Sequence, residues 1–296
     1  MYDKSDPRSQ LAQSSSAPIG SDDIAAPETH VFTDPRVAVD TGDGAKVWSA
    51  RGQNFLVRYV ELDSNASLDW DEARGYVLIS TVEQAGVKVS TDEDAVRLEG
   101  RGIVVVPPGK SRISAEGAVV VAAVLDTVDS STGSEAVNAS SYTQSHPRVA
   151  CLADDAPTTQ SLKAYPLSDY PAETGRFGTI FRTHTLMINF LDDQIGPRDP
   201  EKLSPHHHDD FEQGSLTIQG KWRHHIRTPW TTKQSQWRED VHTTVEGPSL
   251  TIIPPPTVHT SRALGEGTNL MIDLFSPPRD DFAAKGWVVN AEDFPQ

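Results

Sequence analysis

The sequence predicts an all-β protein made of two barrels or sandwiches that follow an N-terminal arm. The main observation is a series of short runs of Val, Ile, Leu and Tyr, bounded by Gly, Pro and Asp, which is typical of strands. Helical periodicity is weak along the whole chain, so helices are not expected to build the core. With 296 residues, the chain is also long enough for two ordinary domains.

The predicted organisation has four parts. Residues 1–45 are rich in Ser, Asp, Pro and Ala and are expected to be a disordered or surface-draped arm. Residues 46–126 form the first barrel, and its strands are expected at 54–62, 75–81, 102–109 and 117–125. A polar linker covers 127–170. Residues 171–296 form the second barrel, with strands expected at 178–191, 214–226, 248–256 and 269–275.

An internal repeat supports the division into two halves. Residues 102–125 and 248–275 both read as a strand, a Pro-rich turn, a polar bend, a Gly and a second strand. When the two segments are superposed, Arg112 of the first half stands opposite His259 of the second.

The composition excludes several classes of protein. A formal net charge of −16 argues against a nucleic-acid partner, since binding phosphates requires a basic surface. No apolar run is long enough to span a bilayer, so no membrane partner is expected. Cys151 is the only cysteine, which excludes an intrachain disulfide and a Cys-rich zinc site. The first residues lack the apolar stretch of a signal peptide, and the prediction is a cytoplasmic protein.

A candidate metal site lies in the second half. His206 and His208 are two residues apart, so in an extended segment both imidazoles point to one side. His259 follows a Pro-rich turn about fifty residues later and could join them from a neighbouring strand. Glu212 or Gln213 could supply an oxygen ligand. Three imidazoles and one oxygen suit a divalent transition metal, namely Fe, Mn, Ni, Cu, Co or Zn.

These residues resemble the two motifs of the cupin superfamily. The first motif, G-x5-H-x-H-x3-4-E-x6-G, corresponds here to His206-x-His208-x4-Gln213-x6-Gly220. The second, G-x5-P-x-G-x2-H-x3-N, corresponds to Pro254-x-Pro256-x2-His259, with Pro256 in place of its Gly and Ala263 in place of its Asn.

The oxygen ligand is open at this point. The spacing to Gly220 favours Gln213, which we place first. Ligand strength favours Glu212, because a carboxylate is anionic. Strand parity also favours Glu212, if Leu216 and Ile218 face the barrel interior.

The resemblance implies two jelly-roll barrels of the cupin type, a bicupin with one intact metal site. Fe(II) is the metal that it favours. The first half has no histidine between Ser67 and Thr81, and Arg112 replaces the histidine of the second motif, so that barrel is expected to be degenerate, metal-free and structural. Cupin barrels often pair through edge strands and swapped N-terminal segments, so a homodimer is one option; internal pairing of the two barrels is the other.

Further residues are candidates for lining the cavity. The run TIFRTHTLMINF carries Arg182 and His184 on one face, and the run KWRHHIR carries Trp222 and His224 on one face and Arg227 on the other. Arg182, Trp222 and Arg227 are the predicted substrate contacts, and their charge favours a small anionic or polar substrate. Glu212, His184 and His224 are the candidate acid–base catalysts.

Three functions compete at the level of sequence. The first is a non-haem dioxygenase that acts on a small anionic or carbonyl-containing substrate, as many cupins with several histidine ligands do. The first alternative is a redox-neutral lyase or isomerase on a small acid or sugar acid, in which the metal is a Lewis acid. The second alternative is a non-enzymatic ligand-binding cupin. The need for O2 and the identity of the metal would separate the first two.

Overall fold

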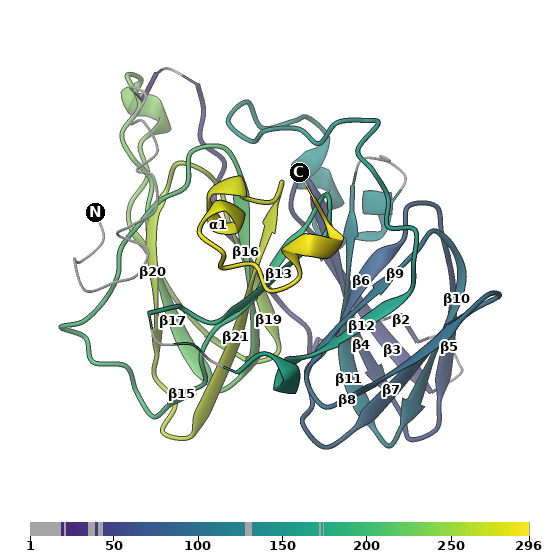
Figure 1. The fold of residues 1–296 in the computed structure, drawn as a ribbon. Helices are drawn as coiled ribbons and strands as arrows, with labels where there is room; N and C mark the ends of the chain where they lie inside the picture. The colour runs from purple at the N-terminus through teal and green to yellow at the C-terminus, as the bar shows by residue number, and fades with distance from the viewer. Residues whose placement is uncertain are drawn as a thin grey trace.

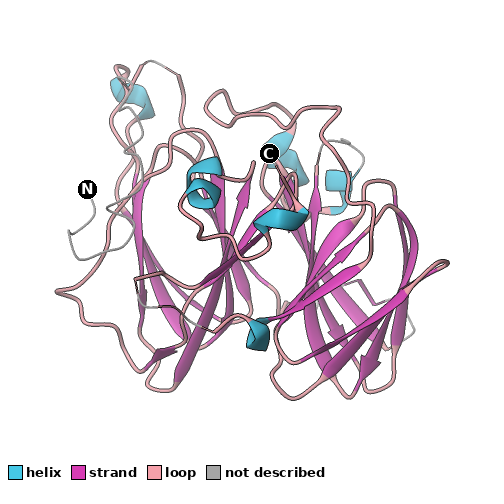
Figure 2. Ribbon diagram, in the orientation of Figure 1, coloured by secondary structure: helices cyan, strands magenta, loops and turns pink. Residues whose placement is uncertain are grey.

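The computed structural model describes residues 19–20, 22–34, 39–40, 44–127, 132–171, 173 and 175–295. Most of the arm predicted over 1–45 therefore lies outside the described residues. The described chain is almost entirely antiparallel β-structure, and its few short helices lie at the ends of the strands (Figure 2). The predicted fold class is confirmed: each half is a jelly roll made of one large and one small sheet, and the two halves lie side by side (Figure 1).

The N-terminal barrel packs a seven-stranded sheet against a four-stranded sheet. The order of the large sheet is β12 (Lys163–Pro166), β9 (Gly102–Val106), β6 (Tyr76–Ser80), β11 (Val119–Asp126), β4 (Phe55–Leu62), β3 (Ala45–Arg51) and β2 (Val39–Asp40). The order of the small sheet is β5 (Ser67–Glu72), β10 (Gly109–Glu116), β7 (Gly86–Thr91) and β8 (Ala95–Glu99).

The C-terminal barrel packs a seven-stranded sheet against a three-stranded sheet. The large sheet runs β1 (Glu28–Val31), β19 (Ser249–Ile253), β16 (Glu212–Gln219), β21 (Thr268–Ser276), β14 (Met187–Phe190) and β13 (Thr179–Arg182), with β15 (Gln194–Ile195) also on β21. The small sheet is β18 (Val241–Glu246), β17 (Lys221–Arg227) and β20 (Val258–Ala263). The helix α1 (Asp280–Ala284) lies beyond one end of these strands (Figure 1).

Three strands come from ranges predicted to be arm and linker. One is β2, within the predicted arm, which pairs with β3 at the edge of the N-terminal large sheet. Glu28–Val31, within the predicted arm, forms β1 and pairs with β19 of the C-terminal barrel. Lys163–Pro166, within the predicted linker, forms β12 and pairs with β9 of the N-terminal barrel. Each segment therefore completes the edge of a sheet.

Two long runs that the sequence predicted as single strands are each divided into two strands. The first is a hairpin of β13 and β14, and the second passes from β16 of the large sheet to β17 of the small sheet. The run 178–191 breaks between β13 and β14 because the Thr183 hydroxyl accepts hydrogen bonds from the backbone N–H groups of Thr185 and Leu186, which holds a turn. The run 214–226 breaks at Gly220, whose φ of 85° favours glycine. Side chains were expected to alternate between two faces along each whole run, and this alternation therefore holds only up to the turn.

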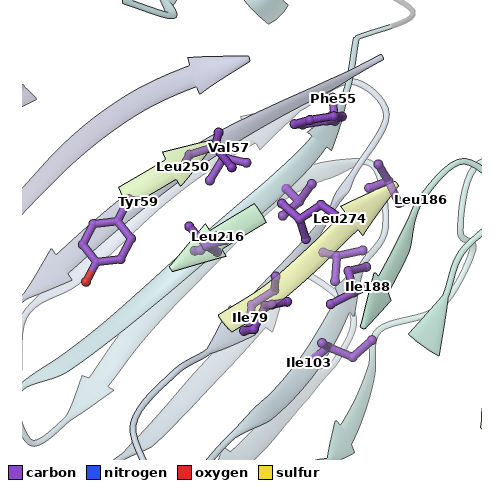
Figure 3. Packing of buried hydrophobic residues seen from close by; sticks show 14 of the residues in the cluster. Phe55, Val57, Tyr59, Ile79, Ile103, Leu186, Ile188, Leu216, Leu250 and Leu274 are labelled. Atoms are coloured by element: carbon purple, nitrogen blue, oxygen red, sulfur yellow. The ribbon is translucent and has the colours of Figure 1, made fainter. Parts of the chain in front are cut away.

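The core between the barrels joins the two seven-stranded sheets face to face. Phe55, Val57 and Ile79 of the N-terminal barrel pack here against Leu216 and Leu274 of the C-terminal barrel (Figure 3). The other face of each large sheet faces its own barrel's interior. Both faces of β6 and β9 are therefore buried, which explains why these strands are continuously apolar instead of alternating.

The interiors of the two barrels differ in polarity. The N-terminal barrel is filled by buried aliphatic side chains from both of its sheets, among them Leu56, Leu78, Val87 and Ile113. On β16 of the C-terminal barrel, Leu216 faces the other barrel, while Gln213, Ser215 and Thr217 lie on the opposite face and are buried. The C-terminal barrel is therefore the one whose interior carries polar chemistry.

None of the helices in the described ranges has both the length and the apolar character needed to cross a bilayer.

Candidate metal centre

Three histidines meet inside the C-terminal barrel. His206 and His259 form an isolated antiparallel bridge, in which the backbone N–H of each donates to the carbonyl of the other at 3.0 and 2.8 Å. His208 follows two residues after His206 and is buried beside both. One ring nitrogen from each histidine lies within 4.8 Å of the others. The structure thus brings the three predicted imidazoles together.

Backbone carbonyls fix the tautomer of two of these rings. His206 Nδ1 lies 2.9 Å from the carbonyl oxygen of Ser204, and His259 Nδ1 lies 3.1 Å from that of Thr257. A carbonyl only accepts, so each Nδ1 carries the hydrogen and donates it. In the neutral ring, Nε2 is then left with a lone pair, which is the arrangement that a metal-binding histidine needs.

Gln213 points its carbonyl oxygen at the same place. Its Oε1 lies 2.9 Å from His208 Nε2 and 3.3 Å from His259 Nε2. Its Nε2 donates to the Ser215 hydroxyl at 2.9 Å and to Asp273 Oδ1 at 3.1 Å. Because the Asp273 carboxylate accepts only, the amide is oriented with Oε1 toward the histidines.

The donor set fits a divalent metal. With both orientations fixed, the lone pairs of Gln213 Oε1 and His259 Nε2 face each other, and two acceptors are not a hydrogen bond. A cation placed between them would be bound by both. Imidazole nitrogens about 2.1 Å from a metal are at most about 4.2 Å apart, close to the 4.8 Å limit of this group.

Glu212 is turned away from this cluster, which corrects its assignment as a catalytic base or oxygen ligand. Its Oε2 accepts a hydrogen bond of 2.6 Å from the backbone N–H of Gln53, and its Oε1 accepts one of 3.3 Å from the Tyr142 hydroxyl. The parity argument failed because Leu216 faces the other barrel, so Glu212 points that way too. Burial raises the pKa of Glu212 to about 7, against the opposing hydrogen bonds from Gln53 and Tyr142.

A cavity of about 610 Å³ opens onto the histidines. Its wall includes His206, Gln213, His259 and the predicted contact Trp222. Arg198 and Asp273 also line it, and the sequence reasoning missed both. The sequence could have indicated Asp273, because it is the lone acid in the apolar strand NLMIDLF. Arg198 lies in a loop, where no periodic pattern marks it.

Arg198 braces the loop that leads to the first histidine. Its guanidinium donates to the Lys202 carbonyl at 2.8 Å, to the Ser204 hydroxyl at 3.0 Å and to the Ser261 carbonyl at 3.3 Å. Ser204 is the residue whose carbonyl orients His206. Arg198 therefore joins this loop to β20.

His224 is buried in the same barrel but does not line the cavity. Its Nδ1 lies 2.8 Å from the Ser261 hydroxyl, and its Nε2 has no hydrogen-bond partner among the described residues. Burial, helped by the nearby His259 and His225, lowers the pKa of His224 to about 4. His224 is therefore neutral near neutral pH.

Three other predicted residues lie elsewhere. His184 lies in the turn after β13, where the centroid of its ring is 5.4 Å from that of Phe294, and it lines a separate small cavity. Arg182 is buried beside Asp280, 3.5 Å away. Arg227 is exposed and paired with Asp240 at 2.6 Å. The hairpin break displaced the first two from the expected face, and Arg227 lies on the outer face of β17.

Comparison with solved structures supports the cupin-like fold. The oxalate decarboxylase of Lactobacillus farciminis, in a formate complex, has a TM-score of 0.58 at 11% identity, over 88% of this chain and 89% of that one. A putative glyoxylate-induced protein from Pseudomonas aeruginosa has 0.54 at 12%, over 93% and 95%. A mutant of the Bacillus subtilis oxalate decarboxylase has 0.59 at 11%, over 88% and 80%. No protein-family model and no curated protein matches the sequence.

Proposed function

We propose that this chain is a metal-dependent bicupin enzyme that catalyses a redox-neutral reaction, of the lyase or isomerase class, on a small carboxylic acid. The metal would be held in the C-terminal barrel by His206, His208, His259 and Gln213. The apolar interior of the N-terminal barrel supports a purely structural role for that half.

One observation carries the proposal. Gln213 Oε1 and His259 Nε2 lie 3.3 Å apart with their lone pairs directed at each other, and both are buried. Each orientation is set by an independent partner, Asp273 for the amide and the Thr257 carbonyl for the ring. Such a pair is stable when a cation lies between its members.

The ligand set has no charge of its own, which bears on the substrate. Three neutral imidazoles and an amide leave the full charge of a divalent ion uncompensated by ligands, so an anionic substrate would be attracted. The metal would act as a Lewis acid on a substrate carboxylate or carbonyl.

The chain's own residues would bind and orient the substrate. Arg198 and Lys202 are the cations of the cavity wall, which also carries the acids Asp192, Glu201 and Asp273, so the attraction for a carboxylate would come chiefly from the metal. Trp222 and Met271 give it apolar surface. Asp273 holds Gln213 in orientation through its bond to the amide nitrogen, so its effect on substrate is indirect.

The lyase reading is preferred to the dioxygenase predicted first. Two of the similar structures carry the name oxalate decarboxylase, and the third is called glyoxylate-induced. Small carboxylic acids are therefore the first substrates to test.

The first experiment measures metal content by mass spectrometry in protein purified without a histidine tag. We expect near one divalent metal per chain in the wild type and its loss in H206A/H208A. The matched control is His207→Ala, because His207 lies between the two ligands yet pairs with Asp209 at 3.4 Å. Absence of metal from the wild type, even after anaerobic loading with Fe(II) or Mn(II), would refute the proposal.

The second experiment screens the loaded protein against small mono- and dicarboxylic acids, with and without O2. Product formation under anaerobic conditions supports a redox-neutral reaction. Turnover in air without stoichiometric O2 uptake supports it as well. Turnover that consumes one O2 per substrate would return the assignment to a dioxygenase.

A further inference from the structure

The outer face of the three-stranded sheet carries a row of basic side chains. On β17 the residues Trp222, His224 and Ile226 are buried, so the alternate residues Lys221, Arg223, His225 and Arg227 point outward. The two ends of the row have acidic partners: Lys221 pairs with Glu246 at 3.2 Å and Arg227 with Asp240 at 2.6 Å. The middle of the row differs.

Two arginines stand directly opposite each other in the middle of this face. The register pairs Arg223 of β17 with Arg262 of β20 on one side and with Thr244 of β18 on the other. Within the described part of the chain, neither guanidinium forms an ion pair; Arg262 Nε donates to the Arg198 carbonyl at 3.1 Å. Like charges directly opposite on neighbouring strands destabilise a sheet. Although the net charge of the chain is −16, no carboxylate of the described residues forms an ion pair with either arginine.

Two histidines extend the cluster along the same face. His225 stands opposite His242 on β18, and their Nδ1 atoms lie 2.9 Å apart. At that distance one ring donates a hydrogen to the other. Burial, and then the positive charges of His242, Arg223 and Arg262, lower the pKa of His225. The charges of both arginines therefore reach the histidine pair.

We propose that Arg223, Arg262, His225 and His242 form a binding site for a small dianionic oxyanion of the phosphate type. The two guanidinium forks supply several planar N–H donors, a geometry that suits tetrahedral oxyanions. The imidazoles of His225 and His242 add further N–H donors. This site is separate from the metal centre, and it does not depend on the function proposed above.

A divalent cation is a poorer fit to the same cluster. Two imidazole nitrogens 2.9 Å apart have the spacing of neighbouring metal ligands. However, the two arginines repel a cation, and Asp240, the carboxylate that interacts with His242, is already engaged by Arg227. An anion offsets the charge of both arginines and can accept N–H hydrogen bonds from the imidazoles.

The test titrates inorganic phosphate into the full-length protein by calorimetry at constant ionic strength. We expect one binding event in the wild type and about tenfold or greater weakening in R223Q/R262Q, since hydrogen bonds to charged groups are lost. The matched control is Arg227→Gln, on the same strand and face, which should bind within about twofold because its charge is already neutralised by Asp240. The H206A/H208A variant should bind phosphate as the wild type does, which excludes the metal centre as the site.

The pH dependence gives an independent readout. Charged groups around the histidine pair are Arg223 and Arg227 on β17, Arg262 on β20 and Asp240 at the start of β18. Sulfate is used here because it is a dianion at both ends of the range. The arginines also keep their charge, so we expect tighter sulfate binding near pH 6 than near pH 8, and a flatter profile in H225Q/H242Q. The conservative variant Arg223→Lys, which keeps the charge but loses the fork, should bind with intermediate affinity.

Three results would overturn the proposal. One is the absence of phosphate binding by the wild type at millimolar concentrations. Another is equal binding by the wild type and R223Q/R262Q, each shown to be folded by circular dichroism. A third is tight binding of Zn(II) in place of phosphate that H225Q/H242Q abolishes, which would assign the pair to a metal.

Discussion

Replacing Glu212 by Gln tests whether this buried acid joins the two barrels instead of serving the metal centre. Glu212 is 1% exposed, and its carboxylate accepts hydrogen bonds from Gln53 of the N-terminal barrel and from Tyr142. Gln keeps the size of the side chain and an acceptor for the Gln53 N–H, but it cannot ionise.

The magnitude follows from the pKa. Burial raises the folded-state pKa to about 7 from an ordinary 4.5, so the folded protein holds this proton more tightly than the unfolded chain. The resulting stabilisation is complete below pH 4.5 and is lost as the pH rises to about 7. A difference of 2.5 units is worth at most about 3 kcal/mol.

The assay is urea unfolding of the wild type and Glu212→Gln at several values between pH 5 and pH 8, both treated with EDTA to remove metal linkage. We expect the variant to gain up to about 3 kcal/mol relative to the wild type across this range. Metal content should be unchanged when both proteins are loaded, because Glu212 points away from the histidines. A stability difference that does not vary with pH, or loss of metal in the variant, would refute this account.

Three further predictions concern packing, a buried amide and an exposed ion pair. Phe55→Ala should lower the free energy of unfolding by about 3–5 kcal/mol, measured by urea denaturation, because the ring is 0% exposed and packs onto β16 at Gly214. Asn269→Ala should cost about 2–3 kcal/mol in the same assay, since its amide oxygen accepts from the N–H groups of Lys221 and Gly265 and its two N–H groups are shared among four nearby carbonyls; a change below about 1 kcal/mol would contradict this. Arg227→Gln should change stability by less than about 1 kcal/mol and leave turnover unchanged, because its side chain is 71% exposed; a large loss of kcat would restore it as a substrate contact.

Many of the strands could be predicted from the local pattern of apolar and turn-forming residues. The strands at 54–62, 102–109 and 117–125 closely match β4, β9 and β11, because valine-rich runs bounded by turn residues favour strands whatever their partners. The meeting of His206, His208 and His259 was also predicted, since two-residue spacing and a motif fixed their faces. The strand positions and the shared face of His206 and His208 depend on short-range sequence, whereas His259 was joined to them through the motif resemblance.

The errors came from long-range packing. The sequence does not reveal that the two large sheets pack face to face, and without that fact the side of β16 that faces the barrel interior was misjudged at Glu212. The turn at Thr183–Leu186 is held by a single hydroxyl, which the sequence pattern does not reveal. His184 and Arg182 were therefore predicted to share one face of a strand that in fact ends at Arg182. Arg198 acts from a loop, where periodicity gives no information.

The strand β1 has a consequence for how the chain is made. Residues 28–31 pair with residues 249–252, so the edge of the C-terminal barrel is supplied by a segment that leaves the ribosome about 220 residues earlier. At about 5–20 residues per second, that segment waits roughly 10–45 s for its partner strand, while the N-terminal barrel can already form. A C-terminal half produced separately from residue 171 would leave the β19 edge unpaired and open to association with other chains. The C-terminal barrel is thus complete only in a chain that also carries residues 28–31.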